Sequence, residues 1–366
     1  MSTGPVGVGV IGAGVISDTY IKNLTSFPDV VVHAIGDLRP EAAQAKAEEF
    51  GIVTHGGPEA VLSHPDVEIV VNLTIPVAHV EVALAAVAAG KHVWSEKPFA
   101  MDRDSGAKLL ATAADAGVRL GCAPDTFLGP GLQTARRLIE KGDIGTPLTA
   151  LTLMQSPGPE SWHPNPAFLF QEGAGPLFDI GPYYLTALVQ LFGPVGAVAG
   201  IGSTSRPTRT IGSGPLAGTE FDVTVPSHVS MIAKFESGQS SQHIFSFDSP
   251  LGRHGFVEIT GTEATLALPD PNRFDGEIKL IRREGEWETV ADVKALAERG
   301  TGVLDMARAI RADRPHRATG DLAHHVVDVM VSVSESVDSG AFVDVTSTVD
   351  VPEILPEDWD PSAATV

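Results

Sequence analysis

The stretch VGVGVIGAGVIS, residues 6–17, joins a run of β-branched residues to closely spaced glycines. Residues 6–11 have the composition of a buried strand. Gly12 permits a tight turn, and Gly14 lets a pyrophosphate approach the backbone at the start of the next helix. Ser17 occupies the third position of this glycine fingerprint. The fingerprint is incomplete, but its place between a strand and a helix predicts a dinucleotide site.

The first third of the chain alternates strand-like and helix-like segments. Short runs rich in valine and isoleucine predict strands over residues 6–11, 30–35, 67–73, 92–95 and 119–123. Helical spacing and composition appear between them, over residues 18–26, 39–50, 77–89 and 103–116. Near-continuous apolar strands are buried on both faces. The alternation therefore predicts an α/β fold with a parallel, doubly wound Rossmann sheet.

The character of the chain changes after Pro124, so we predict a domain boundary there. Residues 1–124 would form the dinucleotide-binding domain, and residues 125–366 an α+β domain for substrate binding and oligomerisation. In that second part we expect helices at 132–141, from about 182 to 192, at 301–312 and at 320–338. A long loop is predicted at 156–176. Alternating apolar and polar residues between 221 and 290 predict an open, mostly antiparallel sheet.

Composition excludes several classes of protein. The chain has 366 residues, a formal net charge of −21 and a single cysteine, Cys122. The acidic balance argues against nucleic acid or an anionic membrane surface as a partner. One cysteine cannot form an intramolecular disulfide, and we expect Cys122 to be buried and inert. The first residues lack the pattern of a signal peptide, and no uncharged apolar run is long enough to span a bilayer. We therefore expect a cytoplasmic protein.

Candidate cofactor contacts follow the predicted strands. The second strand ends in AIGDLRP, where Asp37 is placed to accept hydrogen bonds from ribose hydroxyls and to repel a 2′-phosphate. This predicts NAD, whereas Arg39 leaves a case for NADP. The alternative is that Asp37 only caps the next helix. The full set of candidate cofactor residues is Gly12, Gly14, Val15, Ile16, Asp37, Leu38, Arg39, Thr74, His79, Glu96 and Lys97.

The stretch HVWSEKPFAM, residues 92–101, places Lys97 at the carboxyl end of a predicted strand. Ligands of open α/β sheets bind at that edge. Pro98 cannot extend the strand, and a cis Lys97–Pro98 peptide would turn the lysine inward. The alternative is an ordinary exposed lysine at a strand exit.

A second constellation lies in GAGPLFDIGPYYLTAL, residues 173–188. Asp179 and Tyr183 are four residues apart and would share a face if the helix begins near Asp179. Pro182 favours a helix start between them, with Asp179 or Gly181 as a cap, so capping and catalysis both stay open. The preceding loop carries Trp162 and His163, which suit the apolar faces and hydroxyl rim of a sugar. Alternatively, its aromatic residues pack into a domain interface.

Four blocks of sequence together resemble the glucose–fructose oxidoreductase / inositol dehydrogenase (Gfo/Idh/MocA) family of nicotinamide-dependent sugar enzymes. These blocks are IGAGVIS, AIGDLRPEAAQAKAEEFG, TIPVAHVEVALAAVAAGKHVWSEKPFAM and FDIGPYYL. The resemblance implies that Lys97 is catalytic and that Asp179 takes the role of the aspartate in the family's D-x-x-x-H pattern. Tyr183 stands where that pattern has histidine. Glucose–fructose oxidoreductase and dimeric dihydrodiol dehydrogenase are similar in having tyrosine there.

The resemblance also implies a substrate site and its chemistry. Asp125 stands where many members carry asparagine or arginine, and it joins the candidate substrate contacts Lys97, Trp162, His163, Asp179 and Tyr183. A lysine ammonium about 4 Å from a tyrosine favours the phenolate by about 4 kcal/mol at an effective dielectric of about 20, which would make it a general base. Alternatively, Lys97 polarises the substrate oxygen directly, or His163 carries the proton.

Taken with the residues, the resemblance implies an NAD-dependent oxidoreductase acting on a secondary hydroxyl of a cyclic sugar, glycoside or polyol. Two alternatives stay open: a dehydrogenase of trans-dihydrodiols or other non-carbohydrate alcohols, and a nicotinamide-binding sensor without catalysis. No set of His, Cys and carboxylate residues has metal-ligand spacing, so we predict no metal. We also expect a homodimer or homotetramer, because one face of the predicted sheet would otherwise stay exposed.

Overall fold

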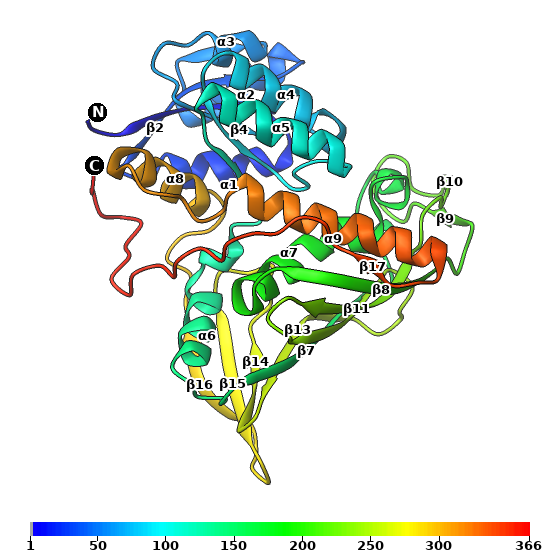
Figure 1. Cartoon of the computed structure of the whole chain (residues 1–366). Coiled ribbons are helices and arrows are strands. Elements are labelled where there is room, and N and C mark those ends of the chain that lie inside the picture. Colours follow the sequence, from blue (N-terminus) through cyan, green and yellow to red (C-terminus); the bar gives the residue numbers. More distant parts are fainter. Residues whose placement is uncertain (1–2) are drawn as a thin grey trace. The chain divides into compact units, whose positions relative to one another are not determined.

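The computed structural model describes residues 3–366, which divide into two compact units (Figure 1). Unit 1 contains the chain up to Gly129, Ala295–Val327 and Pro352–Val366, and unit 2 contains Pro130–Lys294 and Asp328–Val351. Both units are therefore discontinuous in sequence. None of the helices in residues 3–366 is both long enough and apolar enough to cross a membrane.

Unit 1 contains a six-stranded parallel sheet with the strand order β3-β2-β1-β4-β5-β6. Its strands are β1 (Val6–Ile11), β2 (Val30–Gly36), β3 (Thr54–Gly56), β4 (Ile69–Asn72), β5 (His92–Ser95) and β6 (Leu120–Cys122). The order reverses between β1 and β4, as in doubly wound dinucleotide folds, whose ligands bind at the carboxyl edge beside that reversal. The predicted Rossmann sheet is confirmed.

The helices of unit 1 connect these strands, except for α8 (Thr301–Ala312), which comes from a later segment of the chain. The others are α1 (Val15–Leu24), α2 (Pro40–Phe50), α3 (Pro58–Leu62), α4 (His79–Ala88) and α5 (Arg103–Ala116). Helices α2 and α5 both end at a glycine in the left-handed conformation, which is a common helix stop. The sequence pattern missed β3 and α3, because elements of three and five residues are too short to show a period.

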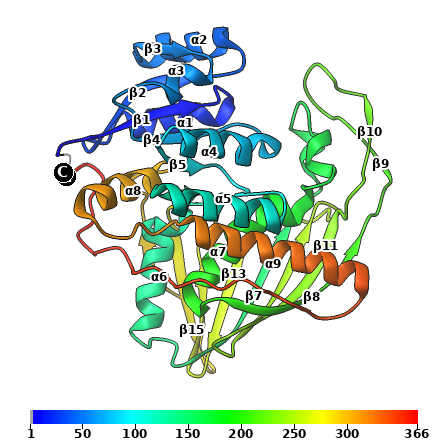
Figure 2. The ribbon, with the colours of Figure 1, turned by 45° about the horizontal axis from the view of Figure 1, so that its top comes forward.

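Unit 2 is built on a nine-stranded sheet with the order β16-β15-β14-β13-β7-β12-β11-β8-β17. Figure 2 labels five of its strands, β7, β8, β11, β13 and β15. The bounds are β7 (Pro147–Gln155), β8 (Val195–Ser203), β11 (His228–Phe235), β12 (Ser240–Ser246), β13 (Arg253–Gly261), β14 (Ala264–Leu268), β15 (Gly276–Arg282), β16 (Glu288–Val293) and β17 (Val343–Asp344). Only the β7–β12 pair is parallel, so the predicted open, mostly antiparallel sheet is confirmed. A separate hairpin joins β9 (Thr208–Thr210) and β10 (Glu220–Asp222).

Two helices lie in unit 2, α6 (Pro130–Glu140) and α7 (Gly175–Phe192), while α9 (Gly320–Ser339) spans the boundary between the units. The predicted start of α7 near residue 182 was wrong: the helix begins seven residues earlier and continues through Pro182. A proline crowds the residue before it. That residue is Gly181, whose missing side chain relieves the crowding. Pro176 occupies the first turn, where a proline fits well.

Candidate active site

The turn after β1 has the geometry that a dinucleotide requires. Gly12 has a φ of +107°, and a Cβ there would lie 2.6 Å from the backbone oxygen of Leu73. Gly14 is the N-cap of α1, no side chain caps this helix, and a Cβ at Gly14 would meet nothing within 4 Å. The first turn of α1 therefore presents backbone N–H groups without a capping side chain, which suits a pyrophosphate.

Asp37 connects the end of β2 to this turn. Its Oδ2 accepts a hydrogen bond from the Ala13 backbone N–H at 2.8 Å, and its Oδ1 accepts one from the Arg39 N–H at 2.8 Å. The Arg39 side chain is largely exposed, and its Nε lies 3.8 Å from Asp37 Oδ1. The carboxylate thus lies beside the glycine turn, where a nucleotide ribose is expected.

Exposed apolar side chains occur along the same carboxyl edge of the sheet. Val15 follows the glycine turn, Leu38 follows Asp37, and Ile75 and Val77 belong to the connection after β4. Their exposed fractions are 93%, 89%, 66% and 73%. Apolar residues gathered in this way fit a ligand with flat, weakly polar rings, as a dinucleotide has.

A buried asparagine organises the loop between β4 and α4. Asn72 is wholly buried, its Oδ1 accepts from Thr74 Oγ1 at 2.6 Å, and its Nδ2 donates to the His79 backbone oxygen at 3.0 Å. The His79 ring then lies between two carbonyl oxygens, with Nδ1 2.7 Å from Pro98 O and Nε2 3.0 Å from Thr74 O. Sequence reasoning missed Asn72, although a polar residue ending an apolar strand was a usable signal.

Lys97 is the second residue after the end of β5, and the Lys97–Pro98 peptide is cis. Glu96 accepts a hydrogen bond from the Lys97 backbone N–H at 3.0 Å, through Oε2, and one from the Tyr20 hydroxyl at 2.8 Å, through Oε1. The lysine is half-buried. His79 and Glu96 therefore connect the Lys97 turn to the loop after β4 and to α1. Sequence reasoning missed Tyr20, since nothing in its local pattern distinguishes it from a core aromatic residue.

Asp125 has a different environment from the one predicted for a substrate contact. It is wholly buried, and its Oδ2 accepts hydrogen bonds from Gly300 N at 2.9 Å and Gly302 N at 3.0 Å, at the start of α8. Burial raises the pKa of this carboxyl to about 6, although the two backbone N–H groups act in the opposite direction. Asp125 therefore anchors α8. Its role as a substrate contact stays a prediction that this geometry does not favour.

In unit 2, α7 carries the second group of candidate residues. Asp179 and Tyr183 lie one turn apart on a single continuous helix and share a face, so Asp179 is not the helix cap. The neighbouring Tyr184 accepts a hydrogen bond from Gly255 N at 2.8 Å, and burial raises the pKa of its phenol well above the usual value. The Tyr184 hydroxyl therefore contacts β13, whereas Tyr183 lies on the helix face that it shares with Asp179.

The loop before α7 presents an exposed aromatic group. Trp162 is 68% exposed. The His163 ring contacts Trp162 and Phe168 edge-on, with centroids 5.5 and 5.6 Å apart, and its Nδ1 accepts from the Asn165 N–H at 3.1 Å. Such a group of ring faces and polar edges suits a sugar.

One arginine holds the base of this loop. Arg209, from β9, has a wholly buried side chain that forms ion pairs with Glu160 and Asp248. It also donates to Pro157 O at 3.1 Å and to Phe247 O at 2.9 Å. The same guanidinium therefore binds both the loop and the end of β12. Sequence reasoning missed Arg209, because its partners are distant along the chain and follow no local spacing.

The candidate residues are thus divided between the units. Unit 1 brings together the candidate cofactor residues and Lys97, and unit 2 brings Asp179 and Tyr183 onto one helix, with Trp162 and His163 in the preceding loop. Among residues 3–366, no three His, Cys, Asp or Glu side chains are gathered in a way that suits a metal ion.

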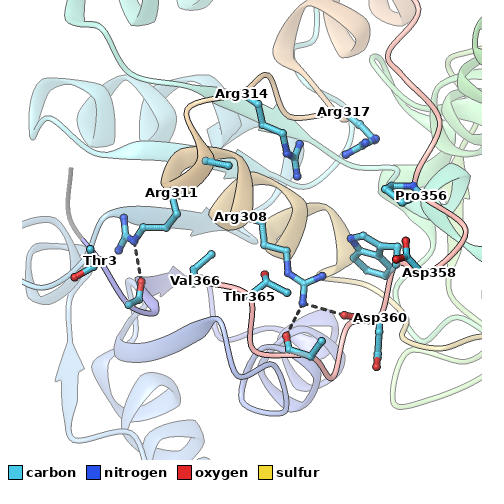
Figure 3. Close-up of a pocket in the computed structure, with 14 residues that line it drawn as sticks. Thr3, Arg308, Arg311, Arg314, Arg317, Pro356, Asp358, Asp360, Thr365 and Val366 are labelled. Atoms are coloured by element: carbon cyan, nitrogen blue, oxygen red, sulfur yellow. Dashed lines mark hydrogen bonds between the residues drawn. The ribbon is translucent and has the colours of Figure 1, made fainter.

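A cavity of about 660 Å³ lies in unit 1, and none of these candidate residues lines it. Figure 3 shows its lining residues on α8 and the C-terminal segment. Its arginines already have acceptors within the chain. Arg308 donates to Asp29 at 2.7 Å and to the backbone oxygens of Asp360 and Ala363, and Arg311 forms two hydrogen bonds with Glu68. Arg308 therefore fastens the C-terminal segment to the rest of unit 1.

Comparison with known proteins agrees with this geometry. Residues 6–123 match the model of the oxidoreductase family with an NAD-binding Rossmann fold, and residues 132–267 match the GFO/IDH/MocA C-terminal domain. Inositol 2-dehydrogenase 3 of Saccharopolyspora erythraea is 31% identical over 273 residues, which is 73% of this chain and 74% of that protein. Levoglucosan dehydrogenase of Pseudarthrobacter phenanthrenivorans is 25% identical over 307 residues, covering 76% and 77%.

Among solved structures, an NAD binding oxidoreductase from Klebsiella pneumoniae superposes with a TM-score of 0.80 at 23% identity, covering 94% of this chain and all of that one. This likeness shows the fold. The family models and the inositol dehydrogenase relative confirm the resemblance seen in the sequence, including the expected cofactor. The chain therefore belongs to the Gfo/Idh/MocA family and is an oxidoreductase that binds NAD.

Proposed function

We propose that the protein is an NAD-dependent dehydrogenase that transfers a hydride between the nicotinamide and a secondary hydroxyl or ketone of a cyclic sugar, glycoside or polyol. The supporting observation is the Lys97 turn, which hydrogen bonds connect to the cofactor edge of unit 1. Two relatives are named for inositol and for levoglucosan. The exposed aromatic loop around Trp162 suits ligands of that class.

The residues of unit 1 fit the cofactor because the turn at Gly12 leaves no room for a side chain and Asp37 lies beside it. When bound, NAD accepts or donates the hydride. Gly12 and Gly14 would hold its pyrophosphate, and Asp37 would bind the ribose hydroxyls of its adenosine. Thr74, His79 and Glu96 would shape the remaining contacts at the ends of β4 and β5.

Proton transfer is the task of this chain's own side chains. Tyr183, as the phenolate that the ammonium of Lys97 favours, takes the hydroxyl proton as the alcohol is oxidised and becomes a neutral phenol, and Asp179 orients the substrate hydroxyl. His163 is the rival proton carrier if Tyr183 is dispensable. The separation of Asp179 and Tyr183 by one turn of α7 supports their assignment, because both side chains then lie on one side of the helix.

The decisive experiment is a substrate panel of sugars, glycosides and inositols with NAD and NADP, followed by absorbance of the reduced nicotinamide. We expect turnover of a cyclic polyol with NAD. Failure of every polyol together with turnover of a trans-diol would instead favour the non-carbohydrate dehydrogenase. Bound NAD that no compound reduces would favour the sensor.

We also propose that a second copy of the chain covers the open face of the unit 2 sheet. Ser230 on β11 pairs with Ile201 on β8 and with Ile244 on β12. The same row continues through Leu153 on β7 to Phe256 on β13. The next row contains Ile232 and Leu151, which are 43% and 37% exposed, while the residues alternating with them are buried. These two rows combine exposed apolar side chains with Ser230, Gln242 and Glu258, a mixture that suits a self-complementary interface.

Light scattering at micromolar concentration tests the second copy. We expect a dimer or tetramer for the wild type, and a smaller particle for Ile232→Glu. Val31→Glu is the matched control, because Val31 is an equally exposed apolar residue on β2 of unit 1. A monomeric wild type would overturn the proposal.

A further inference from the structure

A chain of three buried side chains extends from the core of unit 1 to the Lys97 turn. Trp94 Nε1 lies 3.3 Å from the Tyr20 hydroxyl, that hydroxyl lies 2.8 Å from Glu96 Oε1, and Glu96 Oε2 lies 3.0 Å from the Lys97 backbone nitrogen. Tyr20 and Trp94 are wholly buried, and Glu96 is 9% exposed. Every member of the chain therefore depends on its protein partners rather than on water.

The direction of these hydrogen bonds is fixed by chemistry. An indole nitrogen only donates and a carboxylate only accepts, so the Tyr20 hydroxyl accepts from Trp94 and donates to Glu96. Burial, together with the nearby charges of Glu96 and Asp125, raises the pKa of the Tyr20 phenol well above its usual value. The Tyr20 hydroxyl therefore stays protonated and donates its hydrogen bond to Glu96.

The far end of the chain is rigidly packed. A Cβ on Gly302 would lie 2.0 Å from the Trp94 ring, and one on Gly121 would lie 2.7 Å from it, so the indole fills the space that these glycines leave. Trp94 cannot rotate without displacing α8 or β6. A fixed indole keeps the Tyr20 hydroxyl in place, and that hydroxyl in turn fixes the carboxylate of Glu96.

We propose that Tyr20 is a positioning residue for Lys97, acting through the carboxylate of Glu96. Tyr20 belongs to α1, the helix whose first turn would bind the pyrophosphate, so the chain connects the cofactor-binding helix to the lysine turn. His79 fixes the other side of the turn by its contact with Pro98 O. The inference rests on the proposed function, because that function assigns Lys97 to the catalysed step.

The test compares Tyr20→Phe with the wild-type enzyme, saturated with NAD and with the substrate that the panel identifies. Losing a hydrogen bond to a buried carboxylate should loosen the turn, so we expect kcat to fall about tenfold to a hundredfold. KM for substrate and Kd for NAD should stay within about twofold. Hydrogen exchange of the peptide containing Lys97 should become faster, because the Lys97 amide relies on Glu96.

Thr152→Val is the matched control. Thr152 is wholly buried in unit 2, and its hydroxyl lies 2.7 Å from His243 Nδ1, so its removal also deletes a buried hydrogen bond. It should lower the melting temperature while kcat and exchange at Lys97 stay as in the wild type. Glu96→Gln should resemble Tyr20→Phe. The double variant should be little worse than either single one, because the two residues act as one unit.

Near-normal kcat in Tyr20→Phe, or unchanged exchange at Lys97, would overturn the inference. A kcat loss shared by Thr152→Val would also overturn it, since general destabilisation would then explain both variants. Failure of the proposed function is seen separately, as absence of wild-type turnover. In that case the exchange measurement on the NAD complex still decides whether Tyr20 holds the Lys97 turn.

Discussion

The cofactor edge of unit 1 and the candidate substrate region of unit 2 are built in different ways. Unit 1 relies on backbone shape, since the turn at Gly12 excludes a side chain and the start of α1 has no capping side chain. Unit 2 relies on side chains, with Asp179 and Tyr183 on α7 and a loop held at its base by Arg209. Backbone shape suits a ligand common to a whole family, while exchangeable side chains suit a variable substrate.

The two regions therefore predict different responses to mutation. In unit 1, adding a small side chain beside the backbone of the glycine turn should weaken NAD binding. In unit 2, side-chain changes should act on turnover and leave NAD affinity alone. Lys97 is the exception, because it belongs to unit 1 and is assigned to chemistry.

The largest effect is expected for Lys97→Met. Turnover should fall about a hundredfold to ten-thousandfold, the usual range for a proton-transfer or charge-stabilising group, while Kd for NAD changes little. Lys91→Met is the matched control. Lys91 precedes the other end of β5, and its Nζ donates only to the backbone oxygens of His64 and Val67 among the hydrogen bonds described. Steady-state kinetics and NAD titration of both variants would show whether unit 1 contributes more than cofactor binding.

Tyr183→Phe tests whether a side chain of unit 2 affects turnover without affecting NAD affinity. We expect a loss of kcat of about a hundredfold or more with NAD affinity unchanged, because the ring is kept and only the hydroxyl is removed. Combined with Lys97→Met, it should add little, since the two residues serve one step. Tyr184→Phe provides the comparison, because its hydroxyl binds Gly255 N. Near-normal kcat in Tyr183→Phe would remove tyrosine from the reaction and make His163 the next residue to test.

Asp125 gives a prediction on stability rather than on turnover. Its folded pKa of about 6 lies above the ordinary value of 3.8, so the folded protein binds its proton more tightly than the unfolded chain. The stabilisation from this proton is fully present below about pH 4 and is lost as the pH rises through about 6, a change of about 3 kcal/mol.

In Asp125→Asn this group no longer titrates. The free energy of unfolding of the variant minus that of the wild type should therefore rise by up to that amount between pH 4 and pH 7, measured by urea denaturation. Asp115→Asn, at an exposed position on α5, is the control and should show no such rise. A flat difference for Asp125→Asn would mean that the buried carboxyl is solvated or neutralised in another way.

Gly14→Ala tests whether the space beside Gly14 is needed by bound NAD rather than by the folded protein itself. A Cβ at Gly14 meets nothing within 4 Å and the φ of −77° suits alanine, so the free protein should lose at most about 1 kcal/mol of stability. Close approach of a pyrophosphate should nevertheless weaken NAD binding by roughly tenfold or more. Gly57→Ala is the control, because Gly57 is the N-cap of α3 with a similar φ of −71°, and a Cβ there would meet only the end of the flexible Glu59 side chain. Equal NAD affinity in the two variants would contradict a backbone cradle at Gly14.

The smallest effect concerns the choice between NAD and NADP. Asp37→Ser removes the carboxylate that would face a 2′-phosphate, and the ratio of kcat/KM for NADP to that for NAD should rise about tenfold. Kinetics with both cofactors measure this ratio. A wild type that already prefers NADP would mean that Arg39 dominates, as its exposed side chain near Asp37 would allow.

Much of unit 1 could be predicted because its signals are local. The strands β1 and β5 and the helix α5 lie where the periodicity placed them, and the fingerprint around Gly12 identified the cofactor edge. The family resemblance pointed to Lys97 and Asp179. The start of α7 was misjudged because Pro182 is ordinarily a helix breaker, and only the three-dimensional setting shows that Gly181 makes room for it.

Contacts between distant segments could not be predicted. The pairing of Asp125 with the start of α8, the four partners of Arg209 and the chain from Trp94 to Lys97 join residues that have no fixed spacing in the sequence. Their side chains are ordinary core or surface types when read alone. Such contacts also determine which polar groups are buried, and hence properties such as the high pKa of Asp125.

The discontinuity of unit 1 has a consequence for how the protein is made on the ribosome. Asp125 and Trp94 find their partners, Gly300 and Gly302, only after residues 130–294 have been synthesised. At typical elongation rates of about 5–20 residues per second, this delay is on the order of ten seconds. During that time the indole of Trp94 and the carboxylate of Asp125 lack the contacts with Gly300 and Gly302 that cover them in the folded protein. Bound NAD therefore cannot stabilise unit 1 fully until its last segments arrive.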